Sequence, residues 1–116
     1  MPDTIVLTIP AADGFRSVAS LVLGGVGSRL ELPYERVDDL QLAVLSVLDA
    51  ATEDAVTLEV EVDEGALAVA IGPLQEGIGS DRPLANVLDR LVSGAEETRR
   101  DGRAWLRLTM PSTALA

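Results

Sequence analysis

Residues 56–71 read VTLEVEVDEGALAVAI, and this stretch decides the fold. In its first half, large aliphatic side chains alternate with Thr or Glu, which is the two-residue period of a strand with one buried face. After the turn Asp63-Glu64-Gly65 the alternation resumes, now with alanine between the larger residues. The stretch therefore predicts a β-hairpin. Its expected core positions are Val56, Leu58, Val60, Val62, Leu67, Val69 and Ile71.

The segment before this hairpin predicts one strand and two helices. Residues 4–9 alternate in the same way, and Pro10 ends the strand. Asp13 is the predicted N-cap of a helix that reaches about Arg29, and Pro33 opens a second helix over residues 34–51. The side chains expected to face the core are Phe15, Val18, Val22 and Val26 in the first helix and Val37, Leu40, Val44, Val47 and Ala51 in the second.

The segment after the hairpin predicts a loop, a third helix and a second hairpin. Residues 72–82 are rich in Gly and Pro, and Pro83 then opens a helix. Residues 96–100 and 103–110 form the second hairpin around the turn Asp101-Gly102. The third helix is expected to turn Leu84, Val87, Leu88 and Leu91 inward.

These elements follow one another as β-α-α-β-β-α-β-β, which predicts an α+β fold. Antiparallel strand pairs with helices between them indicate a two-layer α/β sandwich, with one mixed sheet covered by helices on one face. The whole of residues 1–110 is predicted to be a single domain, and residues 111–116 a flexible tail.

Composition excludes several kinds of chemistry. The chain has no His, no Cys and no Lys, so it lacks histidine phosphotransfer, thiol nucleophiles and the lysine of a phosphate-binding loop. A net charge of -10 repels nucleic acid and anionic membranes, so neither is an expected partner. No signal peptide is visible, and the longest apolar stretch, residues 42–51, is too short to span a membrane. A cytoplasmic location is therefore expected.

Three short segments occur in a characteristic order. Residues 37–44 read VDDLQLAV, residues 67–71 read LAVAI and residues 88–94 read LDRLVSG. In this order and spacing they resemble the anti-sigma-factor serine kinases, which belong to the ATPase superfamily of histidine kinases, heat-shock 90 chaperones and gyrase. The resemblance covers residues 4–110 and implies the histidine kinase-like ATPase type of sandwich.

The chain departs from this family at the nucleotide-binding helix. The family carries a Glu there as general base and, four residues later, an Asn that binds magnesium. The resemblance places these positions at Ser46 and Ala50. A serine without a partner is a weak base, and alanine offers a cation no oxygen. Moving the frame by one residue gives Leu45 and Asp49, which does not restore the pair. No catalytic residue and no metal ligand is therefore assigned.

The glycine box is also altered. The family has an Asp that binds the adenine amino group, followed by two glycines at alternate positions. Here Gln75-Glu76-Gly77-Ile78-Gly79 keeps both glycines and places Gln at the Asp position. If nucleotide binding survives, the resemblance assigns it to Asp49, Gln75, Gly77 and Gly79, with ATP and Mg as ligands. The alternative is a loop in which glycine supplies only conformational freedom, and no cofactor is then expected.

The last hairpin and the second helix carry residues with two interpretations. Arg99, Arg100, Arg103 and Arg107 either bind a phosphate or an acidic protein, or pair with Glu96, Glu97 and Asp101 of the same hairpin. Trp105 points away from the core face, where it is either an exposed binding residue or stacked under arginine. Leu42 and Leu45 lie on or beside the polar side of the second helix. Residues 72–82 are expected to close over that side, with Leu74 or Ile78 filling the site.

The resemblance implies a regulatory protein-binding module of anti-sigma type without kinase activity. Its partner would be a sigma factor or an antagonist of the anti-anti-sigma type, and a homodimer is compatible with the family. The alternative is an ATP-binding serine/threonine protein kinase that uses non-standard residues. A third class is a structural or sensory domain that holds a small ligand on the same scaffold.

Overall fold

The computed structural model describes residues 3–10, 13–63 and 66–111. The predicted turn residues Glu64 and Gly65 and the tail after Pro111 lie outside these ranges. The described elements are β1 (Asp3–Pro10), a 3-10 turn (Asp13–Phe15), α1 (Arg16–Arg29), α2 (Tyr34–Ala50), β2 (Ala55–Asp63), β3 (Ala66–Leu74), a 3-10 turn (Ile78–Ser80), α3 (Arg82–Leu91), β4 (Gly94–Arg100) and β5 (Arg103–Pro111).

The five strands form one sheet in the order β1-β2-β3-β5-β4, and every neighbouring pair is antiparallel. The prediction of a mixed sheet is therefore wrong. Helices α1 and α2 together carry the chain away from the end of β1 and back, so that Pro10 lies opposite Ala55 at the start of β2. Strands β3 and β4 do run in the same direction, but β5 lies between them, so no parallel pair forms.

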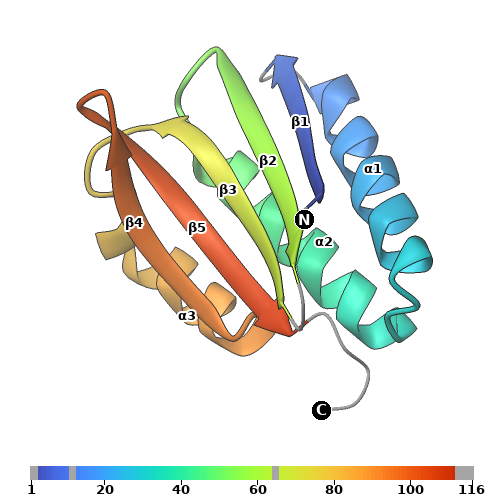
Figure 1. The fold of residues 1–116 in the computed structure, drawn as a ribbon. Helices are drawn as coiled ribbons and strands as arrows, with labels where there is room; N and C mark the ends of the chain where they lie inside the picture. Colours follow the sequence, from blue (N-terminus) through green and yellow to red (C-terminus); the bar gives the residue numbers. More distant parts are fainter. Residues whose placement is uncertain (1–2, 11–12, 64–65, 112–116) are drawn as a thin grey trace.

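All three helices cover one face of the sheet, as Figure 1 shows. The predicted contact between the first hairpin and the second helix is confirmed, because both contribute to one buried cluster. Strands β2 and β3 supply Val56, Leu58, Val60, Leu67, Val69 and Ile71, and α2 supplies Leu40, Val44 and Val47, with Val37 partly buried beside them. No described helix is both long and apolar enough to cross a membrane.

The first helix faces the core differently from the prediction. The α-helix begins only at Arg16, because residues 13–15 form a 3-10 turn and Phe15 occupies the N-cap position predicted for Asp13. Phe15 is 43% exposed, whereas Ala19 and Leu23 are completely buried. Apolar residues occur almost all round this helix, so periodicity alone does not define its buried side. Val87 of α3, also predicted inward, is similarly exposed.

Strand β3 is longer than predicted and is buried on both faces. It continues through Gly72 and Pro73 to Leu74, with an irregular register after Ile71, so the loop begins later. On the helix-free face, Ala68 and Ala70 are buried as well. Their small side chains leave room for longer ones from the neighbouring strands to lie across them.

Trp105 is one of those longer side chains. It lies on the helix-free face, as predicted, but only 9% of its surface is exposed. Its indole packs against Gly72, and the Arg100 guanidinium lies over the ring, with Cζ 4.1 Å from the ring centre. The prediction of an exposed tryptophan is wrong, and the alternative of stacking under arginine is confirmed, with Arg100 as the arginine.

Three of the four arginines of the last hairpin pair with acids, but not with those of their own hairpin, and Arg107 bonds to the hydroxyl of Thr109. The predicted partners Glu96, Glu97 and Asp101 are wrong, because the sheet brings acids from distant segments closer. The observed pairs are Arg99 with Glu76, Arg100 with Glu59 and Arg103 with Glu53. All are partly exposed, so each contributes little to stability alone.

Candidate functional site

Helix α2 carries Ser46 and Ala50, the positions to which the resemblance assigns a base and a metal ligand. The Ser46 hydroxyl donates a hydrogen bond of 2.7 Å to the carbonyl of Leu42, one turn earlier in the same helix. This bond uses the hydroxyl proton within the helix backbone. Ala50, at the other position, offers only its carbonyl oxygen, and that oxygen accepts a hydrogen bond from Gln75. Neither residue presents the chemistry of the family at this helix.

Gln75 closes the end of α2. Its Nε2 donates to the Ala50 carbonyl at 2.7 Å, and its Oε1 accepts from the backbone N–H of Thr52 at 3.3 Å. Carbonyls in the last turn of a helix lack partners within the helix, so this side chain satisfies one of them. Both ends of the Gln75 amide are therefore bonded to the protein itself.

The other residues assigned to a nucleotide lie in two further places. Asp49 forms an ion pair of 2.5 Å with Arg16, at the start of α1. Gly77 has a φ of 82° and begins the 3-10 turn, a conformation that favours glycine. Gly79 donates its N–H to Oε1 of Glu97 on β4 at 2.8 Å. The contacts of Asp49 thus run to α1 and those of Gly79 to β4, which lie on opposite sides of the molecule (Figure 1).

The loop that was expected to close over α2 contributes to the core. Leu74 and Ile78 are only 1% and 2% exposed, so both side chains are buried in the core. Leu42 nevertheless remains 54% exposed, so the loop does not cover that part of α2. The bond between Gln75 and Ala50 shows where the loop meets the helix: at the last turn rather than at its middle.

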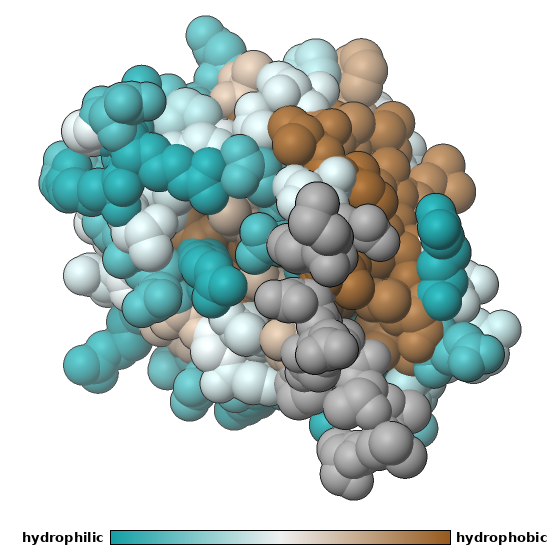
Figure 2. All heavy atoms as spheres, in the orientation of Figure 1, coloured by the Kyte–Doolittle hydropathy of each residue, from teal (hydrophilic) through white to brown (hydrophobic). Residues whose placement is uncertain are grey.

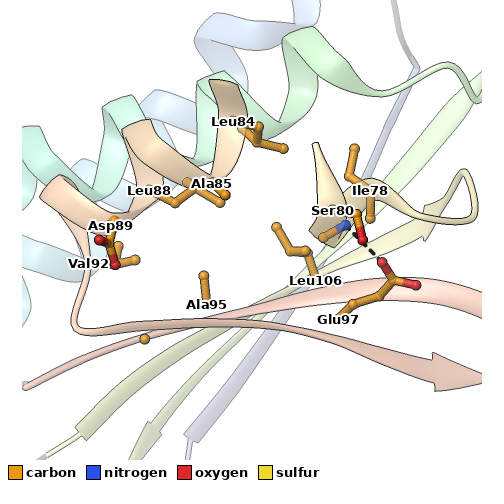
Figure 3. A pocket seen from close by; sticks show the side chains of 12 residues that line it. Ile78, Ser80, Leu84, Ala85, Leu88, Asp89, Val92, Ala95, Glu97 and Leu106 are labelled. Atoms are coloured by element: carbon orange, nitrogen blue, oxygen red, sulfur yellow. Dashed lines mark hydrogen bonds between the residues drawn. The ribbon is translucent and has the colours of Figure 1, made fainter. Parts of the chain in front are cut away.

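A cleft of about 330 Å³ opens between α3 and β4. Figure 3 shows Leu84 and Leu88 of α3 on one side and Ala95 and Glu97 of β4 on the other, with Leu106 between them. A cleft of this volume falls at the lower end of the range for ligand sites. Most of its lining side chains are apolar, while polar atoms contribute nearly half of its exposed wall. Ile78 and Val92 complete the apolar lining.

The cleft exists because small residues stand where larger ones would fill the space. Ala85 on α3, Ala95 on β4 and Gly79 in the turn all border it. Its polar groups are the carboxylates of Glu97 and Asp89 and the hydroxyl of Ser80. The sequence analysis missed this cleft. The only indication of the cleft in the sequence is the short side chains of Ala85 and Ala95. The sequence does not show that these two residues lie close together, because their proximity depends on how α3 packs over the sheet.

Acidic side chains do not gather into a metal site in the described ranges. No group of three or more potential ligands lies close enough together there to hold a metal ion. Two acids of β2 are instead paired or exposed: Glu59 bonds to Arg100, and Glu61 is exposed on the helix-free face.

No family model matches the chain. It is 33% identical over 61 residues to the serine-protein kinase RsbW of Halalkalibacterium halodurans. The match takes in 49% of this chain and 38% of that protein, so this chain corresponds to well under two thirds of the relative. The similarity is thus to a serine-protein kinase, the class that the three sequence motifs resemble.

Proposed function

We propose that the chain is a regulatory protein-binding module of the anti-sigma type that does not transfer phosphate. Its similarity to a serine-protein kinase supports the anti-sigma relationship, and its α+β fold with three helices on one face of an antiparallel sheet is compatible with it. The observation that carries the loss of catalysis is at α2. Ser46 bonds to its own helix. Ala50, to which the resemblance assigns the position of the metal ligand, has no side-chain oxygen, and its carbonyl accepts a hydrogen bond from Gln75.

The expected loss of rate is large. Removing a general base typically lowers a rate by about 10²–10⁴-fold, and losing the metal removes several kcal/mol of charge stabilisation on the phosphoryl group. Gln75 further favours binding without chemistry, because its amide closes α2 rather than facing a ligand. The partner class that this proposal implies is a sigma factor or an antagonist of the anti-anti-sigma type.

Two measurements test the proposal. Isothermal titration with ATP and Mg should give no binding heat, and a phosphotransfer assay with a serine-containing antagonist should show no labelled product. Surface binding measurements with purified sigma factors and antagonists from the same genome should give one saturable complex. An ATP turnover that falls on Gln75→Ala or Asp49→Ala would contradict the proposal.

That contradicting result would support the second candidate, an ATP-binding serine/threonine protein kinase with non-standard residues. The similarity to a protein named as a serine-protein kinase favours this alternative. In it, Asp49 would have to leave Arg16, and Gln75 would have to release Ala50, before either could meet a nucleotide. Weak ATP binding without turnover would instead support a ligand-holding domain.

We further propose a homodimer that forms through β1 and α1. Figure 2 shows hydrophobic residues gathered on the side of the molecule where Figure 1 places these two elements. Leu21 of α1 is 75% exposed and Val6 of β1 is 61% exposed. β1 is also an edge strand, so its outer backbone groups are open to pairing. A contiguous apolar patch on a small protein typically marks an interface.

A further inference from the structure

The second edge of the sheet is strand β4, which lies at the opposite side from β1. In the described part of the chain, β4 pairs only with β5. The N–H and C=O groups of alternate residues in β4 therefore point away from the sheet, as in every edge strand. Such a row of groups accepts an added strand from another protein.

Helix α3 runs beside this edge, and the cleft of about 330 Å³ lies between the two. An added strand places every second side chain on the same face of the sheet. On the α3 side that face presents Ala95 and Glu97 of β4, both of which border the cleft. A side chain that an added strand places beside Ala95 would thus enter the cleft and meet its leucines, Leu84, Leu88 and Leu106.

The charges at the β4 edge restrict which strands of another protein can pair with it. Glu97 accepts a hydrogen bond from Gly79 through Oε1, and it takes part in no ion pair within the described residues. The nearest arginines of β4 already have acidic partners, Arg99 in Glu76 and Arg100 in Glu59. Asp89 adds a second carboxylate at the cleft, and the whole chain carries a net charge of -10. Charged edge residues also suppress indiscriminate strand pairing.

We infer that β4 and α3 form a docking groove for an extended segment of a protein partner, which adds as a strand to β4. One large apolar side chain of that segment enters the cleft beside Ala95. A basic side chain two residues away, on the same face, meets Glu97. The inference rests on the proposed function as a protein-binding module and names the chemistry of the bound segment.

Two labelled heptapeptides serve as probes: Thr-Val-Thr-Leu-Thr-Arg-Thr and its reversed sequence, which cover the two strand directions. Fluorescence anisotropy should show binding of one of them. Asp in place of Arg should weaken binding about tenfold or more, since it removes an attraction and adds a repulsion worth at least about 1.4 kcal/mol. N-methylation of alternate amides in that peptide should abolish binding, because the added strand would lose its backbone hydrogen bonds.

Variants of the protein locate the site. Ala95→Phe fills the cleft and should weaken binding about tenfold or more, as loss of an anchor pocket does. Glu97→Gln keeps an acceptor for the Gly79 N–H and removes only the charge, so it should weaken binding and reduce its salt dependence. Glu96→Gln is the matched control, because it changes the net charge equally on the other face of the same strand. It should change the affinity less than about twofold, a difference under 1 kcal/mol.

Hydrogen exchange gives an independent readout. The peptide should slow exchange at alternate amides of β4 and leave those of β1 unchanged. Urea unfolding of each variant shows whether weaker binding comes from a lost site or from a destabilised fold. If Ala95→Phe is destabilised, the Ala85→Leu variant replaces it, because it fills the cleft from the helix side.

Several results would overturn the inference. They are the absence of peptide binding, equal binding to Ala95→Phe, and protection at β1 instead of β4. If a chain that ends at Pro111 binds the peptide more tightly, the groove is instead occupied by the chain's own terminus. If Ala95→Phe dissociates a dimer, the groove is instead occupied by a second copy of the chain. If a sigma factor or antagonist binds the Ala95→Phe variant with unchanged affinity, the inferred docking groove is wrong, but the proposed function stands. If the peptides bind but no such protein does, the proposed function fails instead.

Discussion

Gly72 and Trp105 depend on each other at the centre of the helix-free face. A Cβ atom built on Gly72 would collide with the indole of Trp105. The indole is in turn covered by Arg100, whose Nη1 lies 2.9 Å from Oε1 of Glu59, two strands beyond Trp105. An arginine that crosses the sheet in this way explains why strand β3 carries alanines on this face, since larger side chains would obstruct it.

Gly72→Ala should therefore destabilise the fold by about 1–3 kcal/mol, the usual cost of forcing atoms into a packed site. Urea unfolding followed by circular dichroism measures this change, and it serves equally for variants that lack Trp105, the single tryptophan of the chain. Gly25→Ala is the control, because a Cβ atom there meets nothing within 4 Å. In a Trp105→Leu background the cost of Gly72→Ala should fall, and an unchanged cost would show that the indole is not the cause.

Helix α3 is the shortest of the three helices and forms one wall of the cleft. Asp81 begins it: the Asp81 Oδ1 accepts from the N–H of Leu84 at 3.0 Å, which satisfies one of the unpaired donors of the first turn. Pro83 adds to this start, since proline suits the first turn of a helix. Leu84 and Leu88 then hold the helix to the sheet.

Asp81→Ala should lower the free energy of unfolding by about 1 kcal/mol, the typical cost of a lost N-cap. Asp81→Asn retains a side-chain acceptor and should cost less than half as much. Thermal unfolding measured by circular dichroism tests both variants. Equal losses in the two variants would mean that the charge at Asp81, rather than the cap, supports the helix.

The sheet has two edge strands, β1 and β4, and their surfaces differ in charge. The β1 edge is apolar, with Val6 and Leu21 exposed beside it, whereas β4 carries charges along its length. The sequence of β4, GAEETRR, is typical of an edge guarded against pairing with copies of itself. We accordingly expect self-association at β1 and α1, and a different protein at β4.

Leu21→Glu should abolish the homodimer, because it buries a charge in an interface that needs about 800 Å² of each partner. Sedimentation equilibrium should show a monomer for this variant and a dimer for the parent chain. Val87→Glu makes the same change at an exposed apolar residue on α3 and should leave the dimer intact. A parent chain that sediments as a monomer at every concentration would refute the proposed dimer.

The sequence by itself determined the elements whose evidence is local. Alternation over residues 56–71 gave the first hairpin, and apolar spacing after Pro33 gave α2, which ends at Ala50, one residue before the prediction. These features follow from neighbours a few residues apart, whose period a single strand or helix imposes.

Only the tertiary structure decided the features that depend on distant segments. These include the antiparallel course of the whole sheet, the partners of the arginines and the burial of Trp105 under Arg100. They also include the use of Gln75 to close α2 and the cleft between α3 and β4. Which residue meets which across the sheet is set by strand order and by the packing of helices on it, and neither leaves a period in the sequence.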